Sequence, residues 1–511
     1  MQSNAQSRAA LHRVPITISV MLASILQALD TTIASVALPR MGGALSATLD
    51  EMEWVLTSYI VAAAVMTPLG GWLANRYGRK RVLLVSVAGF TVCSALCGMT
   101  QSLGEIVVFR TLQGMAGAAL VPLSQAVLLD AYPTEQHGRA TALWGMGVLI
   151  GPIIGPTLGG WLTDHYSWRW VFYINVPFGL LCLAGLLTYM RESPRRVAPF
   201  DLFGFATLSL GIGALQIMLD RGQLLDWFSS TQIVVEAGVA ALAFYLFFVH
   251  SFTARHPFVN LRLFRDRNFA VGNLFIFVIG VVIYATLALL PPMLQDLMGY
   301  SVTLSGVLTS PRGVGAFITM AFVGRLFGRV DTRVLVALGL GTAALALSIM
   351  CRFSLQMDDH LVIWGGFLQG IGTGLAYVPL AAVSFVTLAP QLRNEGTAIF
   401  NLMRNVGSSI GISVMQALLT RHTQIAHASL AGDVSRFSPA VHALRSTAPV
   451  LDPYSAHGLA MLNQVVTRQA SMIAYLDDFK TLMVLTLMLL PLVLLLHPAR
   501  SRPRATAAAL E

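Results

Sequence analysis

Apolar stretches long enough to cross a lipid bilayer follow one another along almost the whole chain. A transmembrane helix needs about 20 mostly apolar residues, and lipid excludes any open backbone because it offers no hydrogen bonds. The chain is 55% hydrophobic and 11% charged, whereas soluble domains carry about 25% charged residues. The sequence therefore predicts an all-α polytopic membrane protein with fourteen transmembrane helices. They are expected near 14–38, 53–74, 82–101, 105–129, 140–162, 170–190, 202–219, 231–250, 269–291, 302–323, 334–352, 361–388, 397–420 and 478–497.

The distribution of Lys and Arg predicts the orientation of these helices. With a cytoplasmic N-terminus, the inner segments hold 21 of the 33 basic residues and the short outer loops hold four. Cytoplasmic loops of membrane proteins carry such an excess. Both terminal tails, 1–13 and 498–511, are therefore expected in the cytoplasm. The formal net charge of +9 follows from this topology, and we expect no nucleic-acid partner.

The sequence contains no pattern of a cofactor or metal site. Its four cysteines lie in or at the ends of apolar stretches, without histidines at metal-ligand spacing. The only lysines are Lys80 and Lys480, and neither follows the glycine-rich run of a nucleotide-binding loop. A membrane enzyme or sensor would need a catalytic constellation or a large soluble domain. We therefore expect a protein that is not an enzyme and needs neither cofactor nor metal.

Asp30 and Arg110 are two of the ionisable residues inside predicted helices, where a charge is costly and usually functional. Asp30 lies in the first helix and suits a proton carrier, although it could also be a structural hydrogen-bonding residue. Arg110 begins the segment R-T-L-Q-G-M-A-G of the fourth helix and shares one face with Gln113, Gly114 and Gly117. A permanently charged Arg can hold a nearby carboxylate ionised. Arg110 could therefore couple to a proton carrier or form a purely structural ion pair.

Small residues recur every four positions in the predicted fifth helix, at Gly147, Gly151, Gly155 and Gly159. Such a repeat leaves a groove without side chains, into which a second helix can pack closely. Prolines in the same segment remove backbone donors and can kink the helix. The predicted hinge and packing surface therefore consists of Gly147, Gly151, Pro152, Gly155, Pro156, Gly159 and Gly160.

Further polar residues interrupt other predicted helices. Arg312 lies in the tenth, and Asn401, Arg404 and Asn405 share one face of the thirteenth. These residues could line a wet cavity or tie helices together, and both interpretations remain open. The candidate substrate cavity comprises Gln113, Arg312, Asn401, Arg404 and Asn405. Three embedded arginines against one embedded acid favour neutral or weakly acidic substrates, although Glu53, Glu236 or Asp296 could also lie within the membrane.

A basic loop, G-W-L-A-N-R-Y-G-R-K-R at 71–81, joins the second and third predicted helices. Its basic residues cannot cross lipid cheaply, because each costs roughly 2.5–3.5 kcal/mol at the bilayer centre. The loop therefore marks a tight cytoplasmic turn. Its pattern resembles the loop signature of the major facilitator superfamily, and a degenerate second copy occurs at 324–333. The signature positions are Gly71, Asn75, Arg76, Gly78, Arg79 and Lys80.

Several segments together resemble the fourteen-helix drug:proton antiporters of this superfamily, the EmrB/QacA type. They are the Asp30 segment, the 71–81 loop, 110–117, 147–160, 168–179, 257–264 and 396–407. The resemblance implies two six-helix halves of inverted repeats, at 14–190 and 269–497. It also implies a linker, 191–268, that contributes two additional helices near 202–250.

The resemblance implies a proton-coupled multidrug exporter of the inner membrane that works by alternating access on lipophilic compounds. Asp30 would carry protons, Arg110 would couple to it, and the 71–81 loop would stabilise the outward-facing state. One departure is Asn75, since the family usually has Asp at this position, so gating here would depend more on hydrogen bonds. A dedicated exporter of one endogenous metabolite or siderophore is the alternative.

Residues 421–477 form the only sizeable predicted segment outside the membrane. Its second part carries Leu459, Leu462, Val466 and further apolar residues at helical spacing, which predicts an amphipathic helix leading to the last span. This helix could cover the edge of the bundle or bind a periplasmic partner. The segment resembles that of EmrB-type members, which implies an adaptor and an outer-membrane channel as partners in a Gram-negative host.

Overall fold

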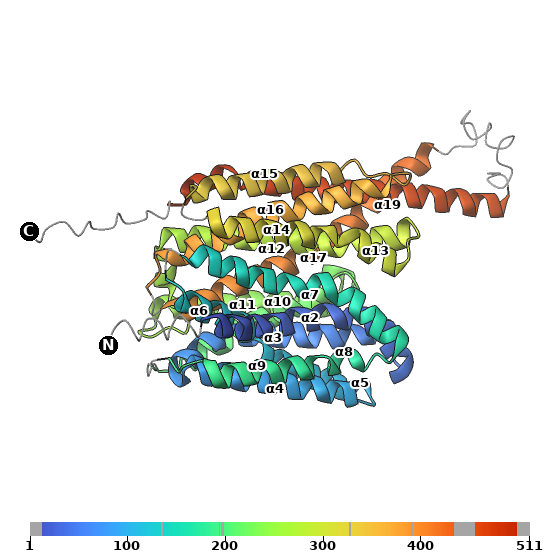
Figure 1. Cartoon of the computed structure of the whole chain (residues 1–511). Coiled ribbons are helices and arrows are strands. Elements are labelled where there is room, and N and C mark those ends of the chain that lie inside the picture. The colour runs from blue at the N-terminus through green and yellow to red at the C-terminus, as the bar shows by residue number, and fades with distance from the viewer. Residues whose placement is uncertain are drawn as a thin grey trace, which may run out of the picture.

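The computed structural model describes residues 13–133, 136–193, 195, 199–326, 329–389, 392–433 and 455–497. These residues form a bundle of long helices (Figure 1). Twelve of the described helices are long and apolar enough to cross a membrane. The predicted all-α, polytopic architecture is thereby confirmed, and the number of spans is considered below.

The main helices follow the predicted order. They are α2 (Arg13–Leu45), α3 (Leu49–Tyr77), α4 (Arg79–Met99), α5 (Leu103–Gly117), α6 (Leu120–Ala131), α7 (His137–His165), α8 (Trp170–Tyr173), α9 (Asn175–Tyr189), α10 (Leu202–Arg221), α11 (Thr231–Thr253), α12 (Arg267–Pro292), α13 (Val302–Thr309), α14 (Pro311–Leu326), α15 (Thr332–Met350), α16 (Asp359–Val386), α17 (Arg393–Asp433) and α19 (Ala456–Met488).

The chain forms two sets of helices with the same internal packing. In the first half, α2 packs on α7 and α9, while α5 packs on α3 and α4. In the second half, α12 packs on α17 and α19, and α16 packs on α14 and α15 in the same way. The halves meet through contacts of α3 with α17 and of α7 with α14. Figure 1 shows the halves as two neighbouring layers of the bundle.

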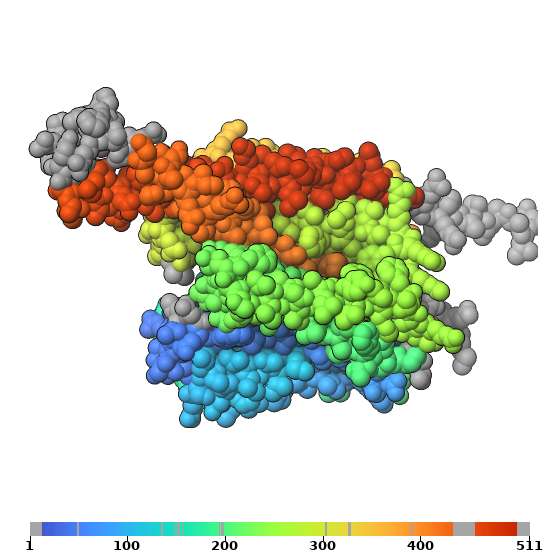
Figure 2. All heavy atoms as spheres, turned by 180° about the vertical axis from the view of Figure 1, so that it is seen from behind, coloured from blue at the N-terminus to red at the C-terminus, as the bar shows by residue number. Residues whose placement is uncertain are grey.

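Helices α10 and α11 join the two halves and pack on one another. α10 also contacts α3 of the first half and α17 of the second. From behind, this pair lies across the boundary between the halves (Figure 2). Much of the outward side of α11 is apolar and exposed, including Leu242, Tyr245 and Phe252. A hydrophobic surface of this kind matches a lipid environment.

Local sequence explains where several helices begin. Thr48 accepts a hydrogen bond from the Glu51 backbone, and the Glu51 carboxylate accepts one from the Thr48 backbone, which is a complete capping box. Asp201 and Asp266 cap α10 and α12 through the backbone groups of Gly204 and Phe269. Between α3 and α4, Gly78 has φ of 94°, a conformation that favours glycine.

Several predicted helices are divided or longer in the structure. The sixth is divided at Ile174 into α8 and α9. The fourth predicted span is divided at Ala118 into α5 and α6, and Pro122 occupies the first turn of α6, where its missing N–H costs little. The tenth is divided at Ser310, directly before Pro311. The thirteenth continues beyond the predicted boundary to Asp433.

The predicted amphipathic helix before the last span is present as the first part of α19. Figure 1 shows α17 and α19 extending together beyond the other helices at the face of the bundle opposite the two chain ends. We call the end of the bundle at Arg13 the terminal face and the opposite end the distal face. Residues 434–454 of the predicted outer loop lie outside the described residues.

Candidate functional site

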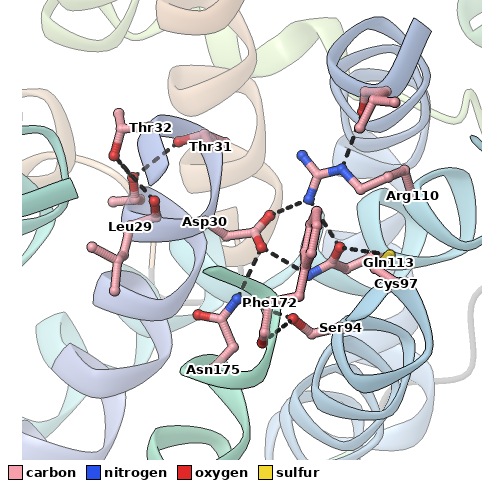
Figure 3. Close-up of polar contacts among 12 residues, drawn as sticks. Leu29, Asp30, Thr31, Thr32, Ser94, Cys97, Arg110, Gln113, Phe172 and Asn175 are labelled. Atoms are coloured by element: carbon pink, nitrogen blue, oxygen red, sulfur yellow. Dashed lines mark hydrogen bonds and ion pairs between the residues drawn. The ribbon is translucent and has the colours of Figure 1, made fainter. Parts of the chain in front are cut away.

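Asp30 lies on α2 inside the first half of the bundle, with no exposed surface. Its carboxylate accepts three side-chain hydrogen bonds (Figure 3). Arg110 Nη1 donates to Oδ2 at 2.6 Å, while Gln113 Nε2 and Asn175 Nδ2 donate to Oδ1 at 3.0 and 2.9 Å. Asn175 also donates to Ser94 Oγ at 3.0 Å. Helices α2, α4, α5 and α9 therefore all contribute to the surroundings of one carboxylate.

Arg110, the partner of Asp30, is also fully buried. Its Nε donates to the Val55 carbonyl at 3.1 Å, and Nη1 also reaches Gln113 Oε1 at 2.9 Å. The guanidinium carbon lies 4.2 Å from the centroid of the Tyr59 ring, where the aromatic face attracts a cation. Arg110 Nη2 has no hydrogen-bond partner among the described residues.

This arrangement makes the Asp30 carboxylate and the Arg110 guanidinium dependent on one another. Removing one partner of a buried pair leaves an uncompensated charge, which costs about 3–5 kcal/mol. Protonation of Asp30 would remove its charge and weaken the attraction of Arg110. The ion pair therefore holds α2 and α5 together inside the first half.

A cavity of about 320 Å³ lies between the two halves of the bundle. This volume falls within the range of small-molecule sites, roughly 300–1,000 Å³. The first half contributes residues of α2 and α7, and the second half contributes residues of α12, α13, α14 and α16. Most of these residues lie in the distal half of their helices. They include Thr32, Ser35, Thr157, Ile283, Leu287, Leu290, Thr309, Arg312, Gly370 and Thr373.

The cavity wall is mainly apolar, with hydroxyl groups and one cation. Arg312 lines the cavity and donates to the Ile283 carbonyl at 2.8 Å. None of the described residues that line the cavity is acidic. Asp30 is not among the lining residues, although Thr32 on the same helix is. Residues two positions apart on an α-helix point roughly 200° apart, so Asp30 faces the interior of the first half.

Contacts between the halves close the terminal side of this cavity. The Trp144 and Tyr377 rings stack with centroids 6.3 Å apart. Asn401 Nδ2 donates to Gln125 Oε1 at 3.0 Å. Each contact joins one half to the other: Trp144 lies on α7 and Gln125 on α6, whereas Tyr377 lies on α16 and Asn401 on α17. The conformation therefore has a cavity in its distal part and packed side chains in its terminal part.

A charged bridge lies at the terminal face itself. Asp130, at the end of α6, binds both Arg79 of the loop signature and Arg393 of α17. The Arg393 Nη1–Asp130 Oδ1 distance is 2.7 Å. The side chains of Arg79 and Arg393 are 9% and 13% exposed, so both are largely removed from solvent. Asp130 thereby connects the basic loop of the first half to the second half.

Other loop-signature residues contact further elements at the terminal face. Asn75 contacts Asn394 and Glu395 of α17. Lys80 Nζ donates to the Leu187 carbonyl at 2.7 Å, which fixes the start of α4 against α9. The Arg76 guanidinium lies over the Trp72 ring, 5.3 Å from its centroid. The loop is thus packed against α9 and α17 at the terminal face.

The repeated glycines of α7 face α2. A Cβ atom at Gly151 would lie 2.4 Å from the Ala28 carbonyl carbon, and one at Gly155 would lie 2.2 Å from Thr32 Oγ1. Thr32 Oγ1 also donates to the Gly151 carbonyl at 3.1 Å. At Gly160 the nearest atom would be 3.8 Å away. Pro152 and Pro156 lie within α7, and their side chains are outside the described ones.

Comparison with known proteins identifies the family. The model of the Major Facilitator Superfamily matches residues 20–412. The chain belongs to the major facilitator superfamily. It is 36% identical over 493 residues to "Multidrug export protein EmrB" of Escherichia coli (strain K12), covering 95% of each chain. It is 34% identical over 487 residues to "Fatty acid resistance protein FarB" of Neisseria gonorrhoeae, covering 94% of this chain and 96% of that protein.

Solved structures of distant superfamily members share the fold. The crystal structure of the human organic anion transporter MFSD10 (TETRAN) has a TM-score of 0.59 at 14% identity, covering 93% of this chain and 99% of that chain. The proton:xylose symporter XylE has a TM-score of 0.60 at 15% identity, covering 95% and 96%. The resemblance inferred from the sequence motifs is confirmed, and the chain is a membrane transporter.

The structure separates the predicted candidate residues into different places. Asp30, Arg110 and Gln113 lie together, whereas Arg312 lines the cavity. Gln113, Asn401, Arg404 and Asn405 are not among the described lining residues. Asn401 instead joins the halves, and Arg404 donates to Asn405 Oδ1 at 3.4 Å.

Sequence reasoning assigned no role to several residues that the structure places at these sites. They are Asn175, Ser94, Gln125, Asp130, Trp144 and Tyr377. Asn175 lies in the segment 168–179, which was noted as a family motif. An Asn between the apolar residues Ile174 and Val176 was the local signal that it needs a buried partner.

Proposed function

We propose that the protein is a proton-coupled multidrug efflux transporter of the inner membrane that exports lipophilic compounds by alternating access. The observation that carries this proposal is the largely apolar cavity between two similarly packed halves, packed shut on its terminal side. The similarity to proteins named multidrug export and fatty acid resistance proteins supports export as the direction of transport. An apolar cavity selects compounds mainly by burial, which suits many lipophilic substrates.

The proposed topology has fourteen spans, with both termini in the cytoplasm. α7 and α17 would add to the twelve candidate spans, because each packs along a candidate span, α2 and α12 respectively. The excess of Lys and Arg on the terminal side supports a cytoplasmic terminal face. The cavity would then belong to an outward-facing state. Residues 14–190 and 269–497 would form the two halves, and 191–268 would form the linker.

Asp30 is the proposed proton carrier and Arg110 its coupling cation. In the outward-facing state the pair is sealed and ionic, so a proton would enter after local opening of the first half. Neutral Asp30 would release Arg110 and favour rearrangement of α2 against α5. The smooth glycine face at Gly147–Gly160 would let α7 move along α2, and the 71–81 loop would hold the terminal side closed.

Substrates are proposed to be neutral or weakly acidic. Arg110 is matched by Asp30, whereas Arg312 faces the cavity with no acidic lining residue among those described. A lipophilic compound with a carboxylate or phenolate group would offer Arg312 a charged acceptor, and charge-assisted hydrogen bonds are stronger than neutral ones. Lipophilic cations would be repelled by Arg312.

The extension formed by α17 and α19 is the proposed docking surface for a periplasmic adaptor and an outer-membrane channel. Both helices continue beyond the rest of the bundle at the distal face (Figure 1). That face would be periplasmic in the proposed topology. The alternative, that the extension only covers the edge of the bundle, predicts that its removal leaves adaptor-dependent resistance unchanged.

Efflux of a lipophilic dye from energised cells, with and without a protonophore, tests the proposed function. We expect efflux to stop when the proton gradient is collapsed. Efflux that persists would exclude proton coupling. A growth screen with unrelated toxic compounds adds a second test: protection against several supports multidrug export, whereas protection against one or none supports a dedicated exporter of an endogenous compound.

A further inference from the structure

A contact between the halves at the terminal face involves two residues from different helices. Asn75 lies near the end of α3, and Glu395 lies in the first turn of α17. Asn75 Nδ2 donates to Glu395 Oε1 at 3.5 Å, and Asn75 Oδ1 accepts a hydrogen bond from Asn394 Nδ2. The Asn75 amide group thus uses both its donor and its acceptor across the boundary between the halves.

The backbones of the two helices are also close at this point. A Cβ atom at Gly71, one turn before Asn75, would lie 3.2 Å from the Asn394 carbonyl oxygen. Asn394 is 5% exposed. A close backbone contact of this kind fixes the end of α3 against the start of α17, so the side chains at positions 75 and 395 must be compatible in charge.

We infer that Glu395 supplies the acidic charge of the closed terminal gate, on the second half, and that Asn75 is its uncharged partner on the first half. Burial raises the pKa of Glu395 to about 7, whereas the positive end of the helix dipole at the first turn of α17 favours the ionised carboxylate. An aspartate at position 75 would face the Glu395 carboxylate, and such like-charge juxtaposition costs several kcal/mol. The asparagine noted in the loop signature is therefore matched to Glu395. This inference rests on the proposed function.

The neighbouring arginines have other partners among the described residues. Arg393 lies next to this contact but donates to Asp130, which also binds Arg79. Arg76 lies over the Trp72 ring. The gate thus contains two separate elements: an ionic bridge around Asp130, and the hydrogen-bonded contact between Asn75 and Glu395. Glu395 acts as a positioning residue for the closed state and does not contact substrate.

A double-mutant cycle tests the inference. The variants are N75D, E395Q and N75D/E395Q, with N75D/E395D as the matched control that keeps the second carboxylate. Two measurements are made on the full-length protein: hydrogen exchange of the backbone amides at the start of α17, and dye efflux from cells. Hydrogen exchange reports opening of the gate and needs neither a substrate nor a proton gradient.

We expect N75D to speed exchange at the start of α17 by about tenfold or more and to lower efflux, because two carboxylates repel. The E395Q change should reverse most of this effect in N75D/E395Q, whereas N75D/E395D should remain impaired. If N75D has the same effect with Glu or Gln at position 395, or has no effect, the inference is overturned. If the exchange pattern is as expected but the wild-type protein exports no dye, the proposed function is contradicted and the inference about the contact stands.

Discussion

Replacing Asp30 by Asn should destabilise the protein far more than the same change in an exposed ion pair. The Asp30 carboxylate is fully buried and accepts hydrogen bonds from Arg110, Gln113 and Asn175. Without its charge, the buried Arg110 guanidinium remains unbalanced. The expected loss is about 3–5 kcal/mol of unfolding free energy.

The surface pair Arg40–Asp164 provides the matched control. Its atoms are 3.4 Å apart, and its side chains are 69% and 63% exposed. Exposed pairs contribute about 0–1 kcal/mol, so D164N should change stability little. Equilibrium unfolding in mixed micelles measures all variants under one condition.

A double-mutant cycle separates the pair from other effects of the substitutions. Both D30N and R110Q should destabilise strongly, and D30N/R110Q should cost clearly less than the sum of the two, because no lone charge remains buried. The Arg40 and Asp164 substitutions should be additive. If D30N cost no more than D164N, or if the buried pair were additive, the interdependence argued for Asp30 and Arg110 would be refuted.

Three further predictions concern other parts of the molecule. G151A should lower both stability and transport, because its Cβ would lie 2.4 Å from the Ala28 backbone. G160A should be tolerated, because its Cβ would lie 3.8 Å from the nearest atom; thermal unfolding and efflux assays compare the two variants. R312Q should raise, at least several-fold, the concentration of a lipophilic acid that inhibits dye efflux by half. The corresponding concentration of a neutral compound should stay nearly unchanged. D201A should lower the unfolding temperature at pH 7, and its difference from the wild-type protein should shrink as the pH falls below about 4. A difference that stays constant with pH would contradict a lowered pKa of Asp201 in the folded state.

The last of these predictions depends on the direction of one pKa shift. Burial acts to raise the pKa of Asp201, but hydrogen bonds from the Gly204 and Phe258 backbones and the interaction with His250 outweigh it and lower the pKa. A carboxyl group with a lowered pKa stabilises the folded state above its unfolded-state pKa, 3.8 in the reference state. This contribution is lost as the pH falls through the folded-state value.

Local patterns in the sequence predicted the helices well, since hydrophobic length and charged turns are properties of a contiguous segment. The breaks at Ala118, Ile174 and Ser310 were not predicted. Apolar residues continue past the first two, whereas at Ser310 the local signal was Pro311, which can begin a helix but disrupts its interior. The extension of α17 to Asp433 was also missed, since residues 421–433 are polar and resemble a loop in composition. A helix outside the membrane needs no apolar surface all round.

The candidate site was only partly predictable for a different reason. Helical spacing placed Arg110 and Gln113 on one face, and both lie at Asp30. Spacing within one helix does not reveal which other helix packs against it. The contacts of Asn401 with Gln125 and of Asn75 with Glu395 join residues more than 270 positions apart. Only the packing of the two halves brings these side chains together.

Proton release on substrate binding tests the central claim most directly. Purified protein in weakly buffered detergent solution is mixed with a lipophilic dye, and the pH change is followed for the wild-type protein, D30N and D164N. The account predicts release by the wild-type protein and by D164N, and none by D30N, with dye binding by D30N checked separately. Proton release by D30N equal to that of the wild-type protein would show that Asp30 is not the coupling acid.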